Sequence, residues 1–125
     1  PPTPLQMAVA PGHWAGFPWA RLARSTDAML LMSYWSDRVG CPRVRVHCAY
    51  EFTAGNVMLT RKLMGRDDII VHVIGGIGDR MTTSDLNDFI AGARASNADG
   101  ASIYDVVTTK SAWWRKLATL RALGD

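Results

Sequence analysis

The sequence predicts an α/β fold in which parallel strands are covered by helices. Three short apolar segments carry this prediction, at residues 28–35, 69–76 and 101–107, and each leads into an amphipathic helical pattern. Nearly continuous apolar segments with helical crossovers are typical of parallel strands packed against helices. The crossovers are expected to be right-handed.

The first part of the chain is expected to hold a lead-in, a short helix and a long loop. Residues 1–13 hold four of the six prolines and predict an extended lead-in to a domain at 14–125. The aromatic side chains of 13–19 are expected to pack beneath a short helix that begins at Trp19. The loop from Ser36 to Cys48 exceeds the roughly 2–6 residues usual in α/β units, and such loops tend to carry function.

The helices that follow the strands have recognisable starts and ends. Residues 50–64 carry an apolar stripe and are expected to end at Gly65, a residue that suits a left-handed C-cap. A threonine is predicted to cap each of the two later helices, namely Thr82 or Thr83 and Thr108 or Thr109. The buried stripe of the last helix is predicted to consist of Trp113, Leu117, Leu120 and Leu123.

Composition indicates one ordinary globular domain. The 125 residues are 48% hydrophobic and 20% charged, enough for one core. No apolar segment approaches the roughly 20 residues of a membrane-spanning helix, so no span is expected. The proline-rich N-terminus shows no signal-peptide pattern. The net charge of +3 comes from three groups of basic residues, two of them at helical spacing, rather than from one continuous stripe, so no nucleic-acid partner is expected.

Neither a metal nor a nucleotide cofactor is predicted. Cys41 and Cys48 have only His47 nearby and lack zinc-ligand spacing, so they form either a disulfide in an exported protein or two free thiols. The glycines of 75–78 lack the spacing of a dinucleotide fingerprint and the lysine of a phosphate loop. They are better explained by backbone that approaches a ligand or an adjoining strand.

An aspartate follows each predicted strand or lies at its end: Asp37, Asp79 and Asp105. The carboxyl ends of parallel strands meet at one edge of a sheet, so these acids are candidates for acid/base work on a glycosidic bond. The alternatives are structural. Asp79 would cap a turn or pair with Arg80, and Asp105 would anchor a loop through backbone hydrogen bonds.

Aromatic side chains lie at the same predicted strand ends. Tyr34, Trp35 and Tyr104 combine an apolar ring with a polar group, which suits stacking on sugars. The alternative is that they close the top of the core. His72 lies in the middle of an apolar strand, which favours a hydrogen-bonded interior histidine over a catalytic base.

Several of these segments resemble a known family. The Met-Ser-Tyr-Trp segment at 32–35, the blocks 71–79 and 99–105, and the threonine and tryptophan pairs at 108–109 and 113–114 are similar to the closing part of glycoside-hydrolase-like (β/α)8 barrel proteins of actinobacteria. The resemblance implies a partial TIM-type barrel of three to four parallel strands with covering helices. It implies secretion or a cell-envelope location, and action on a cell-wall or extracellular polysaccharide.

The positions at the predicted strand ends make individual residues candidates for roles in such a reaction. The expected catalytic residues are Asp79 and Asp105, and the expected substrate-binding residues are Tyr34, Trp35, Asp37, Gly76 and Tyr104. A complete barrel needs about 250 residues, so one sheet face and both edges would lack cover until the missing half or a second copy is added. The alternatives are a non-catalytic half-barrel that binds saccharide or protein, and a phosphate-binding domain centred on residues 75–83.

Overall fold

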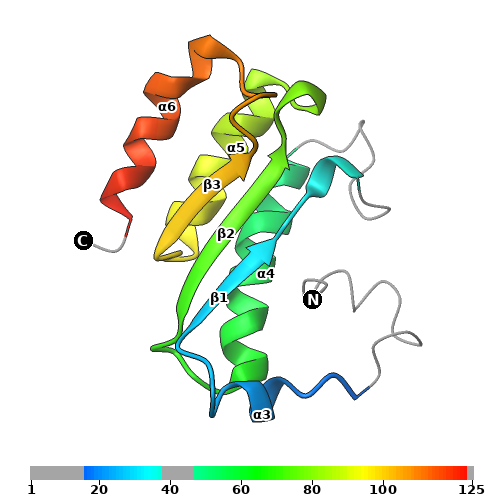
Figure 1. Cartoon of the computed structure of the whole chain (residues 1–125), viewed down its shortest axis with the longest axis vertical. Helices are drawn as coiled ribbons and strands as arrows, with labels where there is room; N and C mark the ends of the chain where they lie inside the picture. The colour runs from blue at the N-terminus through cyan, green and yellow to red at the C-terminus, as the bar shows by residue number, and fades with distance from the viewer. Residues whose placement is uncertain (1–15, 38–46, 124–125) are drawn as a thin grey trace.

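In the computed structural model, three parallel strands form one sheet, and helices cover one of its faces (Figure 1). The structure describes residues 16–37 and 47–123. The strands lie in the order β1-β2-β3, and their bounds are β1 (Ala28–Met32), β2 (Ile70–Ile77) and β3 (Gly100–Tyr104). The predicted α/β class with a parallel sheet is therefore confirmed. The proline-rich lead-in at 1–13 and most of the predicted 36–48 loop lie outside the described residues.

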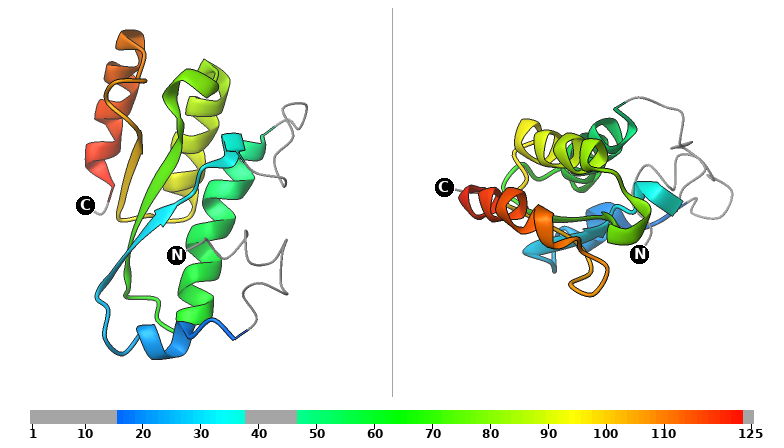
Figure 2. Two further views of the ribbon diagram at one scale, coloured as in Figure 1. Left: turned by 45° about the vertical axis from the view of Figure 1, so that its right-hand side comes forward. Right: turned by 90° about the horizontal axis from the view of Figure 1, so that it is seen from above.

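Two long helices lie together behind the sheet, and a short helix near the C-terminus lies beside β3 (Figure 2). The long helices are α4 (Cys48–Met64) and α5 (Thr83–Ala95), and the shorter ones are α3 (Trp19–Leu22) and α6 (Trp114–Ala118). The 3-10 turns are η1 (Trp35–Asp37), η2 (Gly78–Arg80), η3 (Ser111–Trp113) and η4 (Thr119–Ala122). No helix in the described part of the chain is long and apolar enough to cross a membrane.

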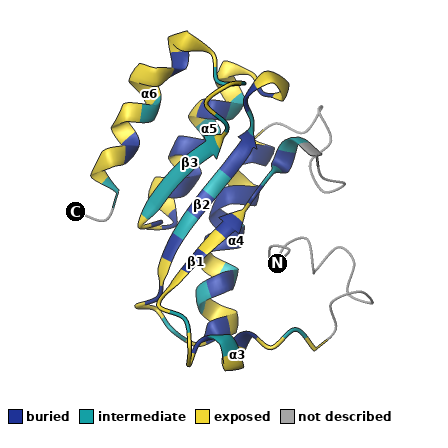
Figure 3. Cartoon of the chain, viewed as in Figure 1, coloured by how far each residue is buried: buried dark blue, intermediate teal, exposed yellow. Residues whose placement is uncertain are grey.

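The two faces of the sheet differ in burial (Figure 3). On the face toward α4 and α5, Leu31 and Val73 are buried, as alternation along a strand requires. On the other face, Leu30 is 62% exposed and Ile70 is 50% exposed. The apolar pattern thus supplies two apolar faces, of which the described residues cover one.

Two predicted strands are shorter than expected. The first ends at Met32 rather than at residue 35, because the chain turns inward at Ser33, whose buried hydroxyl accepts a hydrogen bond from Asn56 Nδ2 at 2.8 Å. The third ends at Tyr104, and Asp105 lies in the loop that follows. Because both strands end early, residues 33–35 and 105–107, which were expected inside the strands, lie beyond the strand ends at the carboxyl edge of the sheet.

Helix ends follow the predicted signals in two places. Gly65 ends α4 with φ of +63°, in the left-handed region that glycine tolerates. Thr82 caps α5 in a reciprocal pair with Asp85, whose backbone nitrogen donates to Thr82 Oγ1 at 3.1 Å.

The last helical segment departs from the prediction. Neither Thr108 nor Thr109 caps it, because both hydroxyls hydrogen-bond within the loop that begins at Asp105. The segment instead runs from η3 through α6 to η4, with Trp113 and Leu120 as its buried side chains. The predicted stripe is therefore only partly buried, since Leu117 and Leu123 pack at its margin.

Arg61 fastens the C-terminal end of α4 to the turn between α5 and β3. Its guanidinium donates to Ser96 O at 2.9 Å, to Asn97 O at 2.8 Å and to Asp99 Oδ2 at 2.9 Å. The same Asp99 oxygen accepts from Val71 N at 2.7 Å, so Asp99 links Arg61 of α4 to the backbone of β2. A planar guanidinium can serve several acceptors at once, which is why arginine suits this position.

Candidate functional site

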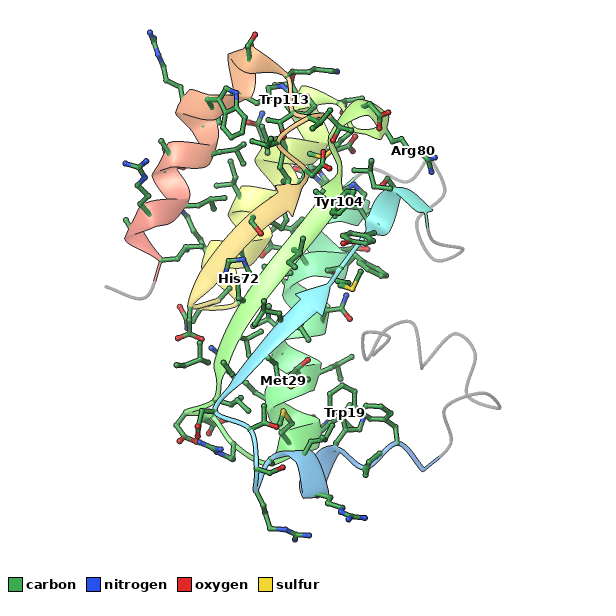
Figure 4. The ribbon with its side chains drawn as sticks, viewed as in Figure 1. Trp19, Met29, His72, Arg80, Tyr104 and Trp113 are labelled. Atoms are coloured by element: carbon green, nitrogen blue, oxygen red, sulfur yellow. The ribbon has the colours of Figure 1, made fainter. Side chains whose placement is uncertain are left out.

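The carboxyl ends of the three strands meet at one edge of the sheet, which is the upper edge in Figure 4, where Tyr104 is labelled. The chain leaves β1 toward Tyr34, β2 toward η2 and β3 toward Asp105. Parallel pairing is the reason that segments far apart in the sequence gather here. In open and closed α/β sheets, this edge is where ligand sites are built.

Tyr34 and Tyr104 form an aromatic pair across the end of β2. Their ring centroids lie 5.8 Å apart with an interplanar angle of 57°, in the range favoured by tilted aromatic pairs. Tyr104 is 49% exposed and Tyr34 is half-buried, so at least one ring faces solvent. The structure thus brings together two of the residues predicted to bind substrate.

Trp35 and Gly76 have a different role from the predicted one. Trp35 is 4% exposed, and its ring lies on Phe89 with centroids 5.3 Å apart. A Cβ atom at Gly75 or Gly76 would lie 2.7 Å or 2.9 Å from the Trp35 ring. The glycines therefore make room for an indole that closes the top of the core, which corrects the prediction of a sugar platform at Trp35 and of a ligand-facing backbone at Gly76.

Asp105 anchors the loop that follows β3. Thr108 N donates to Asp105 Oδ1 at 3.1 Å, and Thr108 Oγ1 lies 3.2 Å from the same oxygen. Asp105 N donates in return to Thr108 Oγ1 at 3.0 Å, and Thr109 N donates to Asp105 O at 3.0 Å. This arrangement matches the structural alternative, in which Asp105 anchors a loop through hydrogen bonds to the backbone. It uses one of the two carboxylate oxygens of Asp105.

Asp79 is exposed on η2, and its turn packs against the Asp105 loop. The contact is made by Gly78, which is buried: a Cβ atom there would lie 2.6 Å from Thr108 O. The structure therefore places the segments that carry Asp79 and Asp105 in direct contact. Asp37 is the last residue of η1, and its side chain lies outside what the structure describes.

Sequence reasoning missed the part that Thr108 plays. A threonine shortly before a predicted helix is expected to be its cap, because threonine is among the residues strongly preferred at that position. The signal that distinguishes the two roles is the Asp-x-x-Thr spacing after a strand, which favours a side-chain-to-backbone turn of this kind.

A cavity of about 230 Å³ opens between β3 and α6, beside the candidate site. Its lining is mainly apolar and includes Ile103, Val106, Trp114 and Leu117. Trp114 is 46% exposed, so its ring is accessible from this side. The second residue of the tryptophan pair is thus a candidate contact that the sequence did not single out.

His72 lies on the sheet face opposite α4 and α5, where Figure 4 labels it. Its Nε2 lies 2.9 Å from Ser102 Oγ, and its ring packs against Gly100, where a Cβ atom would clash. Burial lowers the pKa of His72, because a charged imidazole loses water contact there. The hydrogen-bonded, neutral histidine fits the structural interpretation of this residue.

We expect His72 to make the folded chain less stable in mild acid. The pKa of His72 is lower in the folded state than in the unfolded state, where it is about 6.5, so the unfolded state takes up the proton first. Stability is full above about pH 6.5 and falls as the pH drops below that value. Urea unfolding at pH 7.5 and 5.5 should show a smaller loss for His72→Gln than for the wild type. Equal losses would contradict this assignment.

The N-terminus of α5 is capped by a carboxylate of its own first turn. The Asp85 carboxylate receives hydrogen bonds from Thr82 N and Oγ1 at 2.7 Å and 2.8 Å, so the N-terminus of α5 already holds an anionic group. Within residues 16–37 and 47–123, no group of three or more metal-ligating side chains lies together.

Cys48 is disulfide-bonded, which favours a disulfide over two free thiols. Cys41 lies outside the described residues.

Comparison of the chain with protein-family models, with curated proteins and with solved structures finds no match.

Proposed function

We propose that this chain is the closing arc of a (β/α)8 barrel that hydrolyses glycosidic bonds in a cell-wall or extracellular polysaccharide. The observation that carries the proposal is the meeting of three features at one edge of a parallel sheet. These are the contact between the Asp79 turn and the Asp105 loop, the exposed Tyr104 ring, and the pairing of that ring with Tyr34. Hydrolysis of a glycosidic bond canonically uses a pair of carboxyl groups, and aromatic rings beside them suit stacking on the sugars of a polymer.

The barrel is supported by the order of the strands and by the open face of the sheet. The strands follow one another in sequence and in space, with the long helices on one side. The opposite face presents Leu30, Met32 and Ile70, which are 62%, 47% and 50% exposed. Apolar side chains of this kind fill the interior of a closed barrel. The remaining strands would come from the missing half or from a second copy of the chain.

In the proposed reaction, Asp79 and Asp105 are the acid pair. One carboxyl group protonates the oxygen of the leaving sugar, while the other, ionised, attacks the anomeric carbon or activates a water. The Tyr34–Tyr104 pair offers a ring face for the apolar side of a sugar and hydroxyl groups for its rim. A separation of about 5–5.5 Å between the two carboxyl groups in the assembled barrel would give retention, and about 6.5–9.5 Å would give inversion.

A location outside the cell or in its envelope belongs to the same proposal. The disulfide at Cys48 supports it, because such bonds form and persist mainly in oxidising compartments. A polysaccharide of the wall or the surroundings is the substrate class that such a location would make available.

The second candidate is a half-barrel that binds saccharide without cleaving it. The observation that favours it is the use of Asp105 Oδ1 in anchoring its own loop, as a purely structural aspartate would be used. The tyrosine pair would then serve recognition alone.

An activity and binding screen on the assembled protein separates the two candidates. Purified peptidoglycan, arabinogalactan, chitin and soluble β-glucan would be incubated with the chain, and new reducing ends would be counted. Release of reducing ends from one of these polymers is the expected result. Binding on a glycan array without release from any polymer favours the half-barrel, and neither binding nor release contradicts both. Sedimentation should show a particle larger than one chain, since a stable monomer at high concentration would contradict the open arc.

A further inference from the structure

We infer that Thr108 is the positioning residue of the candidate site, because it orients the carboxylate of Asp105 and also seats the turn that carries Asp79. The inference rests on the proposed function, which supplies the reaction that the two acids would share. It assigns to Thr108 a task that neither the tyrosine pair nor the acids themselves perform.

The first part of the task is the orientation of Asp105. The backbone nitrogen of Thr108 donates to Oδ1 at 3.1 Å, and its hydroxyl accepts from Asp105 N at 3.0 Å. The one proton of that hydroxyl has Oδ1 within reach at 3.2 Å, beside Tyr104 O at 3.2 Å and Asp105 O at 3.4 Å. The reciprocal contacts fix the side-chain torsions of a half-buried aspartate. In the described part of the chain, no hydrogen bond reaches Oδ2. That oxygen is therefore the one left to meet a substrate.

The second part is the placement of the Asp79 turn. Gly78 lies so close to Thr108 that an added Cβ atom would be 2.6 Å from Thr108 O, 2.8 Å from its carbonyl carbon and 3.0 Å from its Oγ1. The residue next to Asp79 thus rests on the residue that holds Asp105. Any shift of Thr108 moves both acids relative to each other.

Such placement matters because a pair of acids works only at a defined separation. A misplacement of about 1 Å can cost on the order of a hundredfold in rate, even when binding is unchanged. Reacting side chains are held at the required separation by supporting residues, whose own positions are fixed by packing and hydrogen bonds. Thr108 contacts neither a substrate nor a leaving group in this account; it acts through Asp105 and Gly78.

The test compares Thr108→Val, Thr108→Ser and Thr109→Val in the assembled protein. Valine keeps the shape of the side chain and removes the hydroxyl, whereas serine keeps the hydroxyl. Thr109 is the matched control, because its hydroxyl donates to the backbone oxygen of Asp105 and not to the carboxylate. On the polymer of the screen that is cleaved fastest, we expect Thr108→Val to lower kcat by about 10- to 100-fold with KM within about twofold. Thr108→Ser and Thr109→Val should stay within about threefold of the wild-type kcat.

A second variant tests the contact with the Asp79 turn. Gly78→Ala keeps the side chains of Thr108 and Asp105 but forces the turn and Thr108 apart, so kcat should again fall by about tenfold or more. Amide exchange at residue 108, measured without substrate, should stay as slow as in the wild type for Thr108→Ser. It should speed up for Thr108→Val.

The outcomes separate the inference from the proposed function. If Thr108→Val and Gly78→Ala keep the wild-type kcat while Asp105→Asn loses activity, Thr108 is not a positioning residue and the hydrolase proposal stands. If Asp79→Asn and Asp105→Asn both keep full activity, the acid pair is wrong and the inference fails with it. A fall in kcat for Thr108→Ser equal to that for Thr108→Val would also overturn the inference, because the hydroxyl would then not be the active feature.

Discussion

Asp105→Asn is expected to lower the rate of polysaccharide hydrolysis by about a thousandfold. Asparagine has the same shape, and its carbonyl oxygen still accepts from Thr108, so the loop after β3 keeps its conformation. The second carboxylate oxygen, however, becomes an amide nitrogen that neither attacks a sugar nor takes up a proton. Initial rates of reducing-end release at saturating polymer would measure the change in kcat.

Asp79→Asn is expected to act at the same step, with a comparable loss of kcat. Asp79 is exposed on η2 and its amide analogue is expected to leave the fold unchanged, so the unfolding temperature should not move. The matched control is Asp67→Asn, an exposed aspartate that precedes β2 and so lies at the opposite edge of the sheet. Full activity in the Asp79 and Asp105 variants would remove these residues from the mechanism.

Trp35→Ala is expected to lower the free energy of unfolding by about 3–5 kcal/mol. The indole is 4% exposed and packs on Phe89, so its removal leaves a large cavity at the top of the core. Urea unfolding followed by circular dichroism would measure the loss. Trp114→Ala serves as the control, because Trp114 is 46% exposed and its truncation should cost about 1 kcal/mol or less.

A double-mutant cycle with Gly76→Ala tests why the glycine is needed. In the wild type, the added Cβ atom would lie 2.9 Å from the Trp35 ring, and overpacking of this kind costs about 1–3 kcal/mol. In the Trp35→Ala background that ring is gone, so the same change should be almost neutral. If the losses of unfolding free energy in Gly76→Ala and Trp35→Ala simply add in the double variant, Gly76 is needed for a reason other than the space that Trp35 occupies.

Most of the fold could be predicted from local patterns. The apolar segments gave the positions of three strands, because burial against helices requires a continuous run of β-branched and aliphatic side chains. Gly65 and Thr82 marked helix ends, since a left-handed C-cap and a capping box depend on neighbouring residues alone. The last helix was harder, because Thr108 and Thr109 have alternative partners in the preceding loop.

The candidate site was predictable only in part. Parallel strands in sequence order are enough to bring Tyr34, Tyr104 and Asp79 to one edge, and the structure places them there. The neighbouring Trp35 could not be assigned, because one step along the backbone turns a side chain from the surface into the core. Its burial depends on Phe89, which lies on a helix more than fifty residues later in the chain.

The α/β class, the order of strands and helices, and the set of aspartates and aromatic residues that follow the strands can all be read from the amino-acid sequence. Which of these side chains face outward, which fill the core, and that Thr108 joins the loops of Asp79 and Asp105 became visible in the folded chain. The difference lies in the range of the interactions. Hydrophobic periodicity and capping act over a few neighbouring residues, whereas ring packing and loop contacts depend on partners that folding brings together.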